Sequence, residues 1–373
     1  MIDRTKSLAE RMALSVMQRY TADQVQWHYE HGLVLQSIFI LGEQTGEAAY
    51  CQWVKALYDL KITHTIEGYR EDEYNLDQIN PGKTLFRLYK TYGEGRYRAA
   101  IERLRAQLRS QPRTQTQGFW HKKIYPFQMW LDGLYMQGPF YAQYTAEFGD
   151  EADFADVVHQ FVLMESQARD PKTGLLYHAW DESRKQLWAD PETGCSPHFW
   201  GRALGWYCMA LVDTLDYIPE TRAKDRDTLR AIANRLVPPL LAYQDPQNGL
   251  WYQVVDHGGR DKNYHESSAS AMFVYFLLKL IRTGMIGAVH RDAAREAAFK
   301  AYGGLIERMI TEDAAGELHL EGICKVAGLG GIPYRDGSYA YYVREPVGAD
   351  DFKGVGPFIL ASLEQARSTA SGH

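Results

Sequence analysis

Cysteine is scarce in this chain of 373 residues, and no CxxC pair occurs in it. The four cysteines, Cys51, Cys195, Cys208 and Cys324, are scattered at irregular spacing. The lack of paired spacing argues against a zinc knuckle and against a redox dithiol. Few, unpaired cysteines fit a reducing compartment, so we expect a cytoplasmic protein.

Long apolar runs and an excess of basic residues are missing as well. The run from Ala269 to Leu278 is too short to span a bilayer, which needs about 20 residues. The N-terminal stretch MIDRTKSLAERMALSVMQRY carries charges throughout, so we expect no signal peptide. The net charge of −6 disfavours a nucleic-acid partner. We therefore expect a soluble protein that binds neither membrane nor nucleic acid.

The signature motifs of several enzyme classes are absent. The sequence has no Gly-rich phosphate loop, no GxSxG elbow and no HExxH zinc motif. His28 and His31 lie close together, but no acid or thiol accompanies them at ligand spacing. We therefore expect no metal site.

Helical periodicity, by contrast, dominates the sequence. We expect twelve helices, at residues 7–20, 27–45, 47–63, 74–92, 95–109, 128–148, 151–168, 197–217, 225–243, 266–283, 291–310 and 353–368. Twelve helices in up-down order form six helical hairpins. Neither a βαβ alternation nor a Pro/Gly/Ser-rich linker interrupts them. Residues 1–373 are therefore expected to form one all-α domain.

A weak internal repeat accompanies the helices. Residues 170–181 read DPKTGLLYHAWD and residues 245–256 read DPQNGLWYQVVD, which share the frame DPxxGLxYxxxD. The length of this frame makes a chance match the weaker explanation. We expect each copy to form a turn and a short extended segment between an odd-numbered helix and the next even-numbered one.

In a closed ring of hairpins, the even-numbered helices are parallel and present their N-terminal ends on one face. Unusual polar and aromatic residues are concentrated at those ends. They include Trp27, His28 and Tyr29 in the second helix, Asp77 in the fourth, Trp130 and Asp132 in the sixth, Trp200, Arg202 and Trp206 in the eighth, and Glu266 in the tenth. Helix N-termini carry unpaired N–H groups and a positive dipole end, so this face suits an anionic ligand.

Asp132 is the first candidate for chemistry. It lies among Trp130, Leu131, Leu134 and Tyr135, and burial among such side chains raises the pKa of a carboxyl. A carboxylic acid that is protonated near neutral pH can donate its proton. The alternative is a helix acid that faces water, and the local sequence does not separate the two.

Asp77 is the second candidate. On a six-hairpin ring Asp77 and Asp132 would be neighbours, and two carboxyls in one pocket push their pKa values apart. Such a pair is the usual equipment for glycoside chemistry. The competing interpretation of Asp77 is a first-turn or capping acid that interacts with the helix dipole.

Arg202 and Trp206 are spaced i,i+4 and share one helix face. A guanidinium beside an indole is suited to a sugar carboxylate, and we expect this face at the mouth of the site. The alternative is an arginine that bridges to a surface acid.

Two histidines and two lysines flank these candidates. His121 and His178 could each bond a sugar hydroxyl or orient an acid, although a lone histidine is more often structural. Lys122 and Lys123 follow His121 directly and are expected to be solvated.

Longer motifs carry a family resemblance. They are GFWH at 118–121, MWLDGLYMQGPF at 129–140, YHAWDE at 177–182 and GCSPHFWGRALGW at 194–206, with WHY at 27–29, LWYQVVD at 250–256 and ESS at 266–268. Over nearly the whole chain they resemble the unsaturated rhamnogalacturonyl hydrolases of glycoside hydrolase family 105. The resemblance implies an (α/α)6 barrel, which agrees with the twelve helices counted from periodicity.

The resemblance also implies a substrate and a mechanism. The substrate would be the disaccharide that a lyase leaves from rhamnogalacturonan, a 4,5-unsaturated galacturonate joined to rhamnose. Asp132 matches the family's general acid and would protonate C4; water would add at C5, and the hemiketal would break down to rhamnose and a 4-deoxy-5-keto uronate. Asp77 would be the second acid, and no metal or organic cofactor is implied. The pocket residues carried over by position are His28, Tyr29, His121, His178, Trp200, Arg202 and Trp206.

The sequence leaves three alternatives open. One is an inverting glucanase-like enzyme, which would need two carboxyls about 6.5–9.5 Å apart. Another is a hydrolase of unsaturated glucuronyl disaccharides from glycosaminoglycans, and the third is a sugar-binding toroid without catalysis. The segment Cys324–Ser338 matches the family least securely and is expected to form a loop over the site. We expect a small-molecule substrate as the only partner, and a monomer or a weak homodimer.

Overall fold

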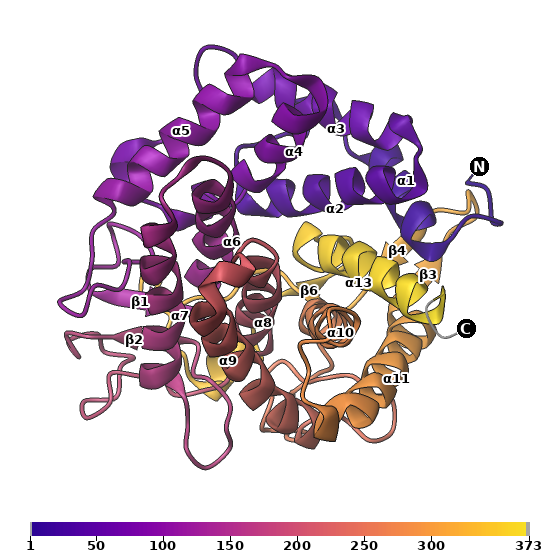
Figure 1. Cartoon of the computed structure of the whole chain (residues 1–373). Helices are drawn as coiled ribbons and strands as arrows, with labels where there is room; N and C mark the ends of the chain where they lie inside the picture. Colours follow the sequence, from indigo (N-terminus) through magenta and orange to yellow (C-terminus); the bar gives the residue numbers. More distant parts are fainter. Residues whose placement is uncertain (1, 371–373) are drawn as a thin grey trace.

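Two concentric rings of helices make up the protein in a computed structural model, which describes residues 2–370 (Figure 1). The inner helices are α2 (Tyr29–Thr45), α4 (Gly82–Tyr92), α6 (Leu131–Phe148), α8 (Gly201–Leu215), α10 (Ser267–Arg282) and α13 (Phe352–Ala370). The outer helices are α1 (Leu8–Arg19), α3 (Ala48–Lys61), α5 (Gly95–Ser110), α7 (Phe154–Ala168), α9 (Ala223–Ala242) and α11 (Arg291–Met309). One further helix, α12 (Tyr339–Tyr342), is a single turn.

Neighbouring inner helices pack against one another around the whole ring. The ring closes where α13 packs against α2, so both ends of the chain lie on the same side of the molecule (Figure 1). The expected all-α (α/α)6 barrel of about twelve helices is confirmed, with α12 as the addition.

Composition explains which helices are inside. Nearly every residue of α6, α8 and α10 is buried, and these helices are apolar on most sides. The outer helix α5 carries many charges and buries only one face. None of the helices within residues 2–370 combines the length and the apolar composition needed to cross a membrane.

The fourth helix begins later than expected, at Gly82 rather than at residue 74. The side chain of Asn75 accepts the backbone N–H of Asp77 at 3.0 Å and holds residues 76–78 in a 3-10 turn. The N-cap of α4 is Pro81, and a proline disfavours the helical conformation of the residue before it, here Asn80. Asp77 therefore lies in the turn before α4, not within the helix.

The eighth helix is also shorter than expected, beginning at Gly201 rather than at residue 197. The Ser196 hydroxyl does not cap it, because that oxygen accepts the N–H of Ala179 at 3.1 Å.

Short strands lie in the connections that lead from outer to inner helices. Strand β1 (Gln128–Trp130) pairs antiparallel with β2 (Ala179–Asp181), β3 (Ile310–Glu312) with β4 (Leu318–Leu320), and β5 (Ile323–Cys324) with β6 (Val347–Gly348). The register of the first pair sets Met129 opposite Trp180.

Both copies of the DPxxG frame form the same turn. The N–H of the aspartate donates to the carbonyl five residues later, at 2.9 and 3.0 Å, and the N–H of the glycine donates to the aspartate carbonyl, at 2.9 and 2.8 Å. Gly174 and Gly249 have φ of 74° and 77°, which favours glycine. The repeat is thus structural, and residues 190–194 form a third copy that the sequence comparison missed.

Candidate active site

Backbone hydrogen bonds gather the candidate residues at the N-terminal end of α6. The N–H of Leu76 donates to the His121 carbonyl at 3.1 Å, and the N–H of His121 donates to the Gln128 carbonyl at 2.9 Å. The N–H of Leu131 donates to the His178 carbonyl at 3.0 Å. These bonds tie the turn before α4, the first strand pair and the start of α6 together. Both expected acids and both expected histidines belong to these connected segments.

Asp132 is the second residue of α6, and 9% of its surface is exposed. Its Oδ2 lies 3.3 Å from Nε2 of His178, which is completely buried. The other ring nitrogen of His178, Nδ1, lies 2.7 Å from the Tyr342 hydroxyl. His178 is thus held at Nδ1, while its Nε2 lies near the Asp132 carboxyl without forming a hydrogen bond among residues 2–370.

The environment of Asp77 differs from that of Asp132, because Asp77 forms an ion pair with Lys122. Its Oδ2 lies 2.6 Å from the Lys122 ammonium and its Oδ1 lies 3.6 Å from Nε2 of His121. Burial opposes ionisation of Asp77, but Lys122 and the neighbouring imidazoles outweigh it and hold the pKa of Asp77 below its ordinary value. Burial likewise lowers the pKa of Lys122, yet Asp77 raises it above the ordinary value overall. The expectation that Lys122 is solvated was wrong.

One wall of the site is aromatic. The rings of His121 and Trp130 are stacked, with centroids 4.7 Å apart and planes at 15°. Tyr125 stacks on Trp130 at 4.9 Å. Burial lowers the pKa of His121 to about 4, so its ring is neutral at neutral pH. The wall therefore offers flat, uncharged faces next to the two acids.

Tyr29 and Trp206 contribute a second aromatic group. Trp206 is buried, stacks on Tyr135 at 5.0 Å and meets the ring of Tyr29 edge-on at 6.0 Å. Burial raises the pKa of Tyr29, and the charges of Glu30 and Asp77 raise it further, so its hydroxyl stays protonated. His28 caps α2 beside it, and 38% of the His28 side chain is exposed. His28 is thus the most accessible of the expected pocket residues.

Arg202 lies deeper than expected, with 1% of its surface exposed. Its guanidinium lies 4.8 Å from the centre of the Trp200 ring and donates to the backbone carbonyl of Cys324. Burial opposes the charge of Arg202, but Cys324 and then Glu266, which is 3.8 Å away, raise the pKa of Arg202 above its ordinary value. Arg202 is therefore beneath the segment that begins at Cys324 and not at the mouth of the site.

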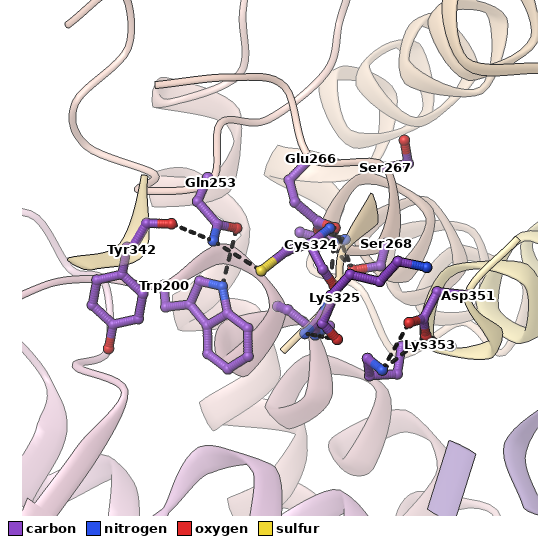
Figure 2. A network of polar contacts seen from close by, with 12 residues as sticks. Trp200, Gln253, Glu266, Ser267, Ser268, Cys324, Lys325, Tyr342, Asp351 and Lys353 are labelled. Carbon is purple, nitrogen blue, oxygen red and sulfur yellow. Dashed lines mark hydrogen bonds and ion pairs between the residues drawn. The ribbon is translucent and has the colours of Figure 1, made fainter. Parts of the chain in front are cut away.

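Polar contacts hold this segment in place, and Figure 2 shows the network. The side-chain oxygen of Gln253 accepts from Trp200 Nε1 at 3.1 Å, and its Nε2 donates to the Tyr342 carbonyl at 3.1 Å. The Glu266 carboxylate accepts the backbone N–H of Cys324 at 3.0 Å. The same network thus positions Tyr342, which bonds His178.

Residues of the Cys324–Ser338 segment contact the candidate site. Leu329 packs in a cluster with Trp130, and Arg335 donates to the Tyr125 hydroxyl at 2.9 Å. Both contacts are to the aromatic wall. Across residues 2–370, no group of three or more His, Cys, Asp or Glu side chains is arranged to hold a metal ion.

Three residues that contact the candidate-site residues were not predicted as such from the sequence. They are Lys122, which pairs with Asp77, Gln253 and Tyr342. Gln253 had a signal, because it occupies the position in the second repeat that His178 occupies in the first. Tyr342 had none, since 164 residues separate it from His178.

Known proteins resemble this chain over most of its length. The sequence profile of Glycosyl Hydrolase Family 88 matches residues 8–369. Protein Atu3128 of Agrobacterium fabrum is 43% identical over 228 residues, which are 61% of this chain and 96% of that protein. The unsaturated rhamnogalacturonyl hydrolase YesR of Bacillus subtilis is 27% identical over 251 residues, 66% of this chain and 68% of YesR.

Solved structures of glycoside hydrolases also resemble this chain. A family 105 glycoside hydrolase from C. acetobutylicum ATCC 824 is 46% identical, with a TM-score of 0.93 over 97% of this chain and 100% of that chain. The unsaturated glucuronyl hydrolase of Bacillus sp. GL1 shares the fold, with 14% identity and a TM-score of 0.70 over 96% of this chain and 95% of that one. The chain therefore belongs to family 105 of the glycoside hydrolases, within the wider group that the family 88 profile describes.

Proposed function

We propose that this glycoside hydrolase releases the unsaturated galacturonyl residue from the disaccharide that a lyase leaves from rhamnogalacturonan. The observation that carries the proposal is the unequal setting of the two acids. Asp77 has a lysine against it, whereas Asp132 faces the imidazole of His178. The surroundings of the two carboxyls thus differ, and acid catalysis needs two groups with different roles, one that donates a proton and one that stays ionised.

In this mechanism Asp132 gives its proton to C4 of the unsaturated ring. The C4=C5 double bond is an enol ether, so the cation that develops at C5 is stabilised by the ring oxygen. Water then adds at C5 and loses a proton to a carboxylate, either Asp77 or the ionised Asp132. The hemiketal opens to a 4-deoxy-5-keto uronate and rhamnose is released. The Tyr29 hydroxyl and the aromatic wall would hold the ring in place.

The choice of galacturonyl over glucuronyl substrate rests on the relatives. YesR is an unsaturated rhamnogalacturonyl hydrolase and is 27% identical, whereas the glucuronyl hydrolase is 14% identical and supports the fold alone. Arg202 is assigned to the substrate carboxylate in this proposal, because its guanidinium has a buried Nε with no partner among residues 2–370.

Replacement of Asp132 by asparagine tests the assignment of the acid. Asp132→Asn keeps the shape but has no proton to give to carbon, so we expect the turnover rate to fall by roughly 10²–10⁴-fold with binding largely kept. The measurement is the decay of ultraviolet absorbance of the unsaturated uronate. Asp292→Asn is the matched control, because Asp292 is the second residue of α11 and is exposed.

Three outcomes would contradict the proposal at different levels. Full activity of Asp132→Asn would remove the acid assignment. A wild-type enzyme that consumes unsaturated glycosaminoglycan disaccharides and leaves the pectic disaccharide intact would replace the substrate. If neither chromophore decays, the hydration reaction itself is wrong.

A further inference from the structure

A cavity of about 430 Å³ lies at the end of the barrel opposite the candidate active site, and we call it the far cavity. All six inner helices line it, with Gln36 from α2, Lys83 from α4, Gln143 from α6, Asp213 from α8, Lys279 from α10 and Glu364 from α13. Its volume falls in the range of small-molecule sites, roughly 300–1,000 Å³. None of the residues assigned to the candidate active site lines it.

Apart from Lys83, the charges on the wall of the far cavity are paired with one another. The pairs are Lys279 with Asp213 and Asp216, both Arg282 and Arg367 with Glu364, and Arg87 with Glu43. Lys279 lies 2.7 Å from Asp213 and 2.6 Å from Asp216, and the contact between Arg282 and Glu364 is bidentate, at 2.6 and 2.9 Å. Because each of these acids is already paired with a basic side chain, the wall needs no ionic ligand to neutralise it.

Two buried polar atoms of the far cavity have no hydrogen-bond partner in the part of the chain that the structure describes. One is Nζ of Lys83, which is 2% exposed and lies 3.6 Å from the centre of the Tyr135 ring. The other is the side-chain oxygen of Gln36, which is 8% exposed. Buried polar groups are rarely left without a partner, because their desolvation is then uncompensated. The two atoms therefore indicate a polar occupant.

The chemistry of these two atoms limits what that occupant is. The Gln36 oxygen only accepts, whereas the Lys83 amine donates, so the occupant must both donate and accept. An anion would meet Asp213 and the negative dipole ends of α8 and α10, whose C-terminal residues line the cavity, and a cation would meet Lys83. Burial lowers the pKa of Lys83 to about 7, so near neutral pH part of the population carries no charge. Hydroxyl groups meet all of these conditions.

We propose that the far cavity is a second carbohydrate site, for a neutral, hydroxyl-rich ligand the size of a monosaccharide. The ring of Tyr217 on its wall supplies an apolar face for the C–H side of a sugar. The cavity opens where Glu43, Gln44 and Asp216 are exposed, so a sugar reaches Gln36 and Lys83 from solvent. The site is separate from the acids of the active site and stands whether or not the proposed reaction is right.

Methyl NMR of the full-length protein with isotope-labelled isoleucines tests the location. Ile40 lines the far cavity, whereas Ile79 lies two residues after Asp77 on the active-site face. Titration with D-galactose, D-glucose and L-rhamnose is expected to shift the Ile40 methyl signal in a saturable way for at least one sugar. D-galacturonate, which carries a carboxylate in place of a hydroxymethyl group, is expected to bind more weakly than D-galactose.

Two variants test the contacts. Gln36→Leu and Lys83→Met each remove one unpartnered atom, and each is expected to weaken sugar binding about tenfold. Gln52→Leu on the exposed face of α3 is the matched control and is expected to leave binding unchanged. Lys83→Met is also expected to raise the thermal midpoint, because it removes a buried amine without a partner.

Three results would overturn the proposal. One is the absence of a saturable Ile40 shift with all three neutral sugars, which would mean that the far cavity holds only water. The second is tighter binding of D-galacturonate than of D-galactose. The third is sugar affinity that neither Gln36→Leu nor Lys83→Met changes.

Discussion

At the scale of single residues, Lys122 distinguishes the two acids of the site. Its ammonium lies 2.6 Å from Asp77, and both partners are largely buried, so the pair is little screened by solvent. His178 supplies the corresponding contact to Asp132, but as an imidazole and at 3.3 Å. The two carboxyls therefore differ because of their neighbours, although both lie close to the N-terminal ends of inner helices.

Removal of the lysine tests this difference. In Lys122→Met burial of Asp77 is no longer opposed by its nearest cation, so the pKa of Asp77 rises. A raised pKa means that less Asp77 is ionised at any acidic pH, and the acid limb of kcat/KM against pH moves to higher pH. We expect kcat/KM to fall roughly tenfold or more, as for loss of one charged hydrogen bond.

The neighbouring Lys123 provides the control for this measurement, because it is exposed and its ammonium lies 3.3 Å from the Asp72 carbonyl and 5.8 Å from the centre of the Tyr74 ring. Lys123→Met is expected to keep both the rate and the shape of the pH profile. An acid limb that stays in place in Lys122→Met would show that Asp77 does not need to be ionised for the reaction.

The sequence could reveal the acids but not their partners. Asp132 was a candidate because it is a lone acid among apolar residues, and Asp77 because it lies near the start of the fourth inner segment. Lys122 was predicted to be solvated, since a lysine next to another lysine shows no sign of burial. The contact of Tyr342 with His178 joins residues 164 apart and depends on how the last connection folds back. Such a contact follows from tertiary structure alone.

At the scale of elements, the DPxxG turns place functional residues at equivalent points. His178 and Gln253 occupy the same position in the two repeats, both are completely buried, and both bond Tyr342. His178 reaches the hydroxyl of Tyr342, and Gln253 reaches its carbonyl. Two copies of one turn thus hold α12 from two sides.

A pair of glycine substitutions measures how far the second turn depends on its glycine. Gly249 has φ of 77°, and an added Cβ would lie 2.8 Å from the Ala301 nitrogen and 2.9 Å from the Lys300 carbonyl carbon. Gly259 has φ of 73° with nothing within 4 Å of an added Cβ. Gly259→Ala is expected to cost roughly 1–2 kcal/mol for the left-handed backbone alone.

Gly249→Ala is expected to lower the free energy of unfolding by roughly 1–3 kcal/mol more than Gly259→Ala does, because backbone atoms of α11 must move. Urea unfolding of the two variants and the wild type gives both values. Equal destabilisation of the two variants would mean that α11 moves away from the added Cβ at no energetic cost, and that the turn is not packed against α11 as described.

Helices were the most predictable elements, because each carries a long apolar period. The start of α4 was not predictable from that period. The bond from the backbone of Asp77 to the Asn75 side chain competes with helix formation, and periodicity does not register it. Strands β1 and β2 are too short for a period, and only the repeat indicated an extended segment at β2.

At the scale of the whole molecule, the fold is a ring that its last helix completes. α13 packs against α2, α10 and α1, so residues near both ends of the chain share one interface. Such a ring gains its full set of contacts only when the last hairpin is in place. This closure favours one cooperative unit, which is the single domain expected for residues 1–373.

A core substitution in α13 tests whether the ring unfolds as one unit. All nine tryptophans lie between Trp27 and Trp251, so none belongs to α13. Ile359 is completely buried in α13, and Ile359→Ala is expected to destabilise the protein by roughly 2–5 kcal/mol. If the ring is one unit, the unfolding transitions seen by tryptophan fluorescence and by helical circular dichroism coincide, and both shift equally in the variant. A variant whose fluorescence transition stays in place while the dichroism becomes biphasic would show that the last hairpin unfolds by itself, and the chain would then consist of more than one folding unit.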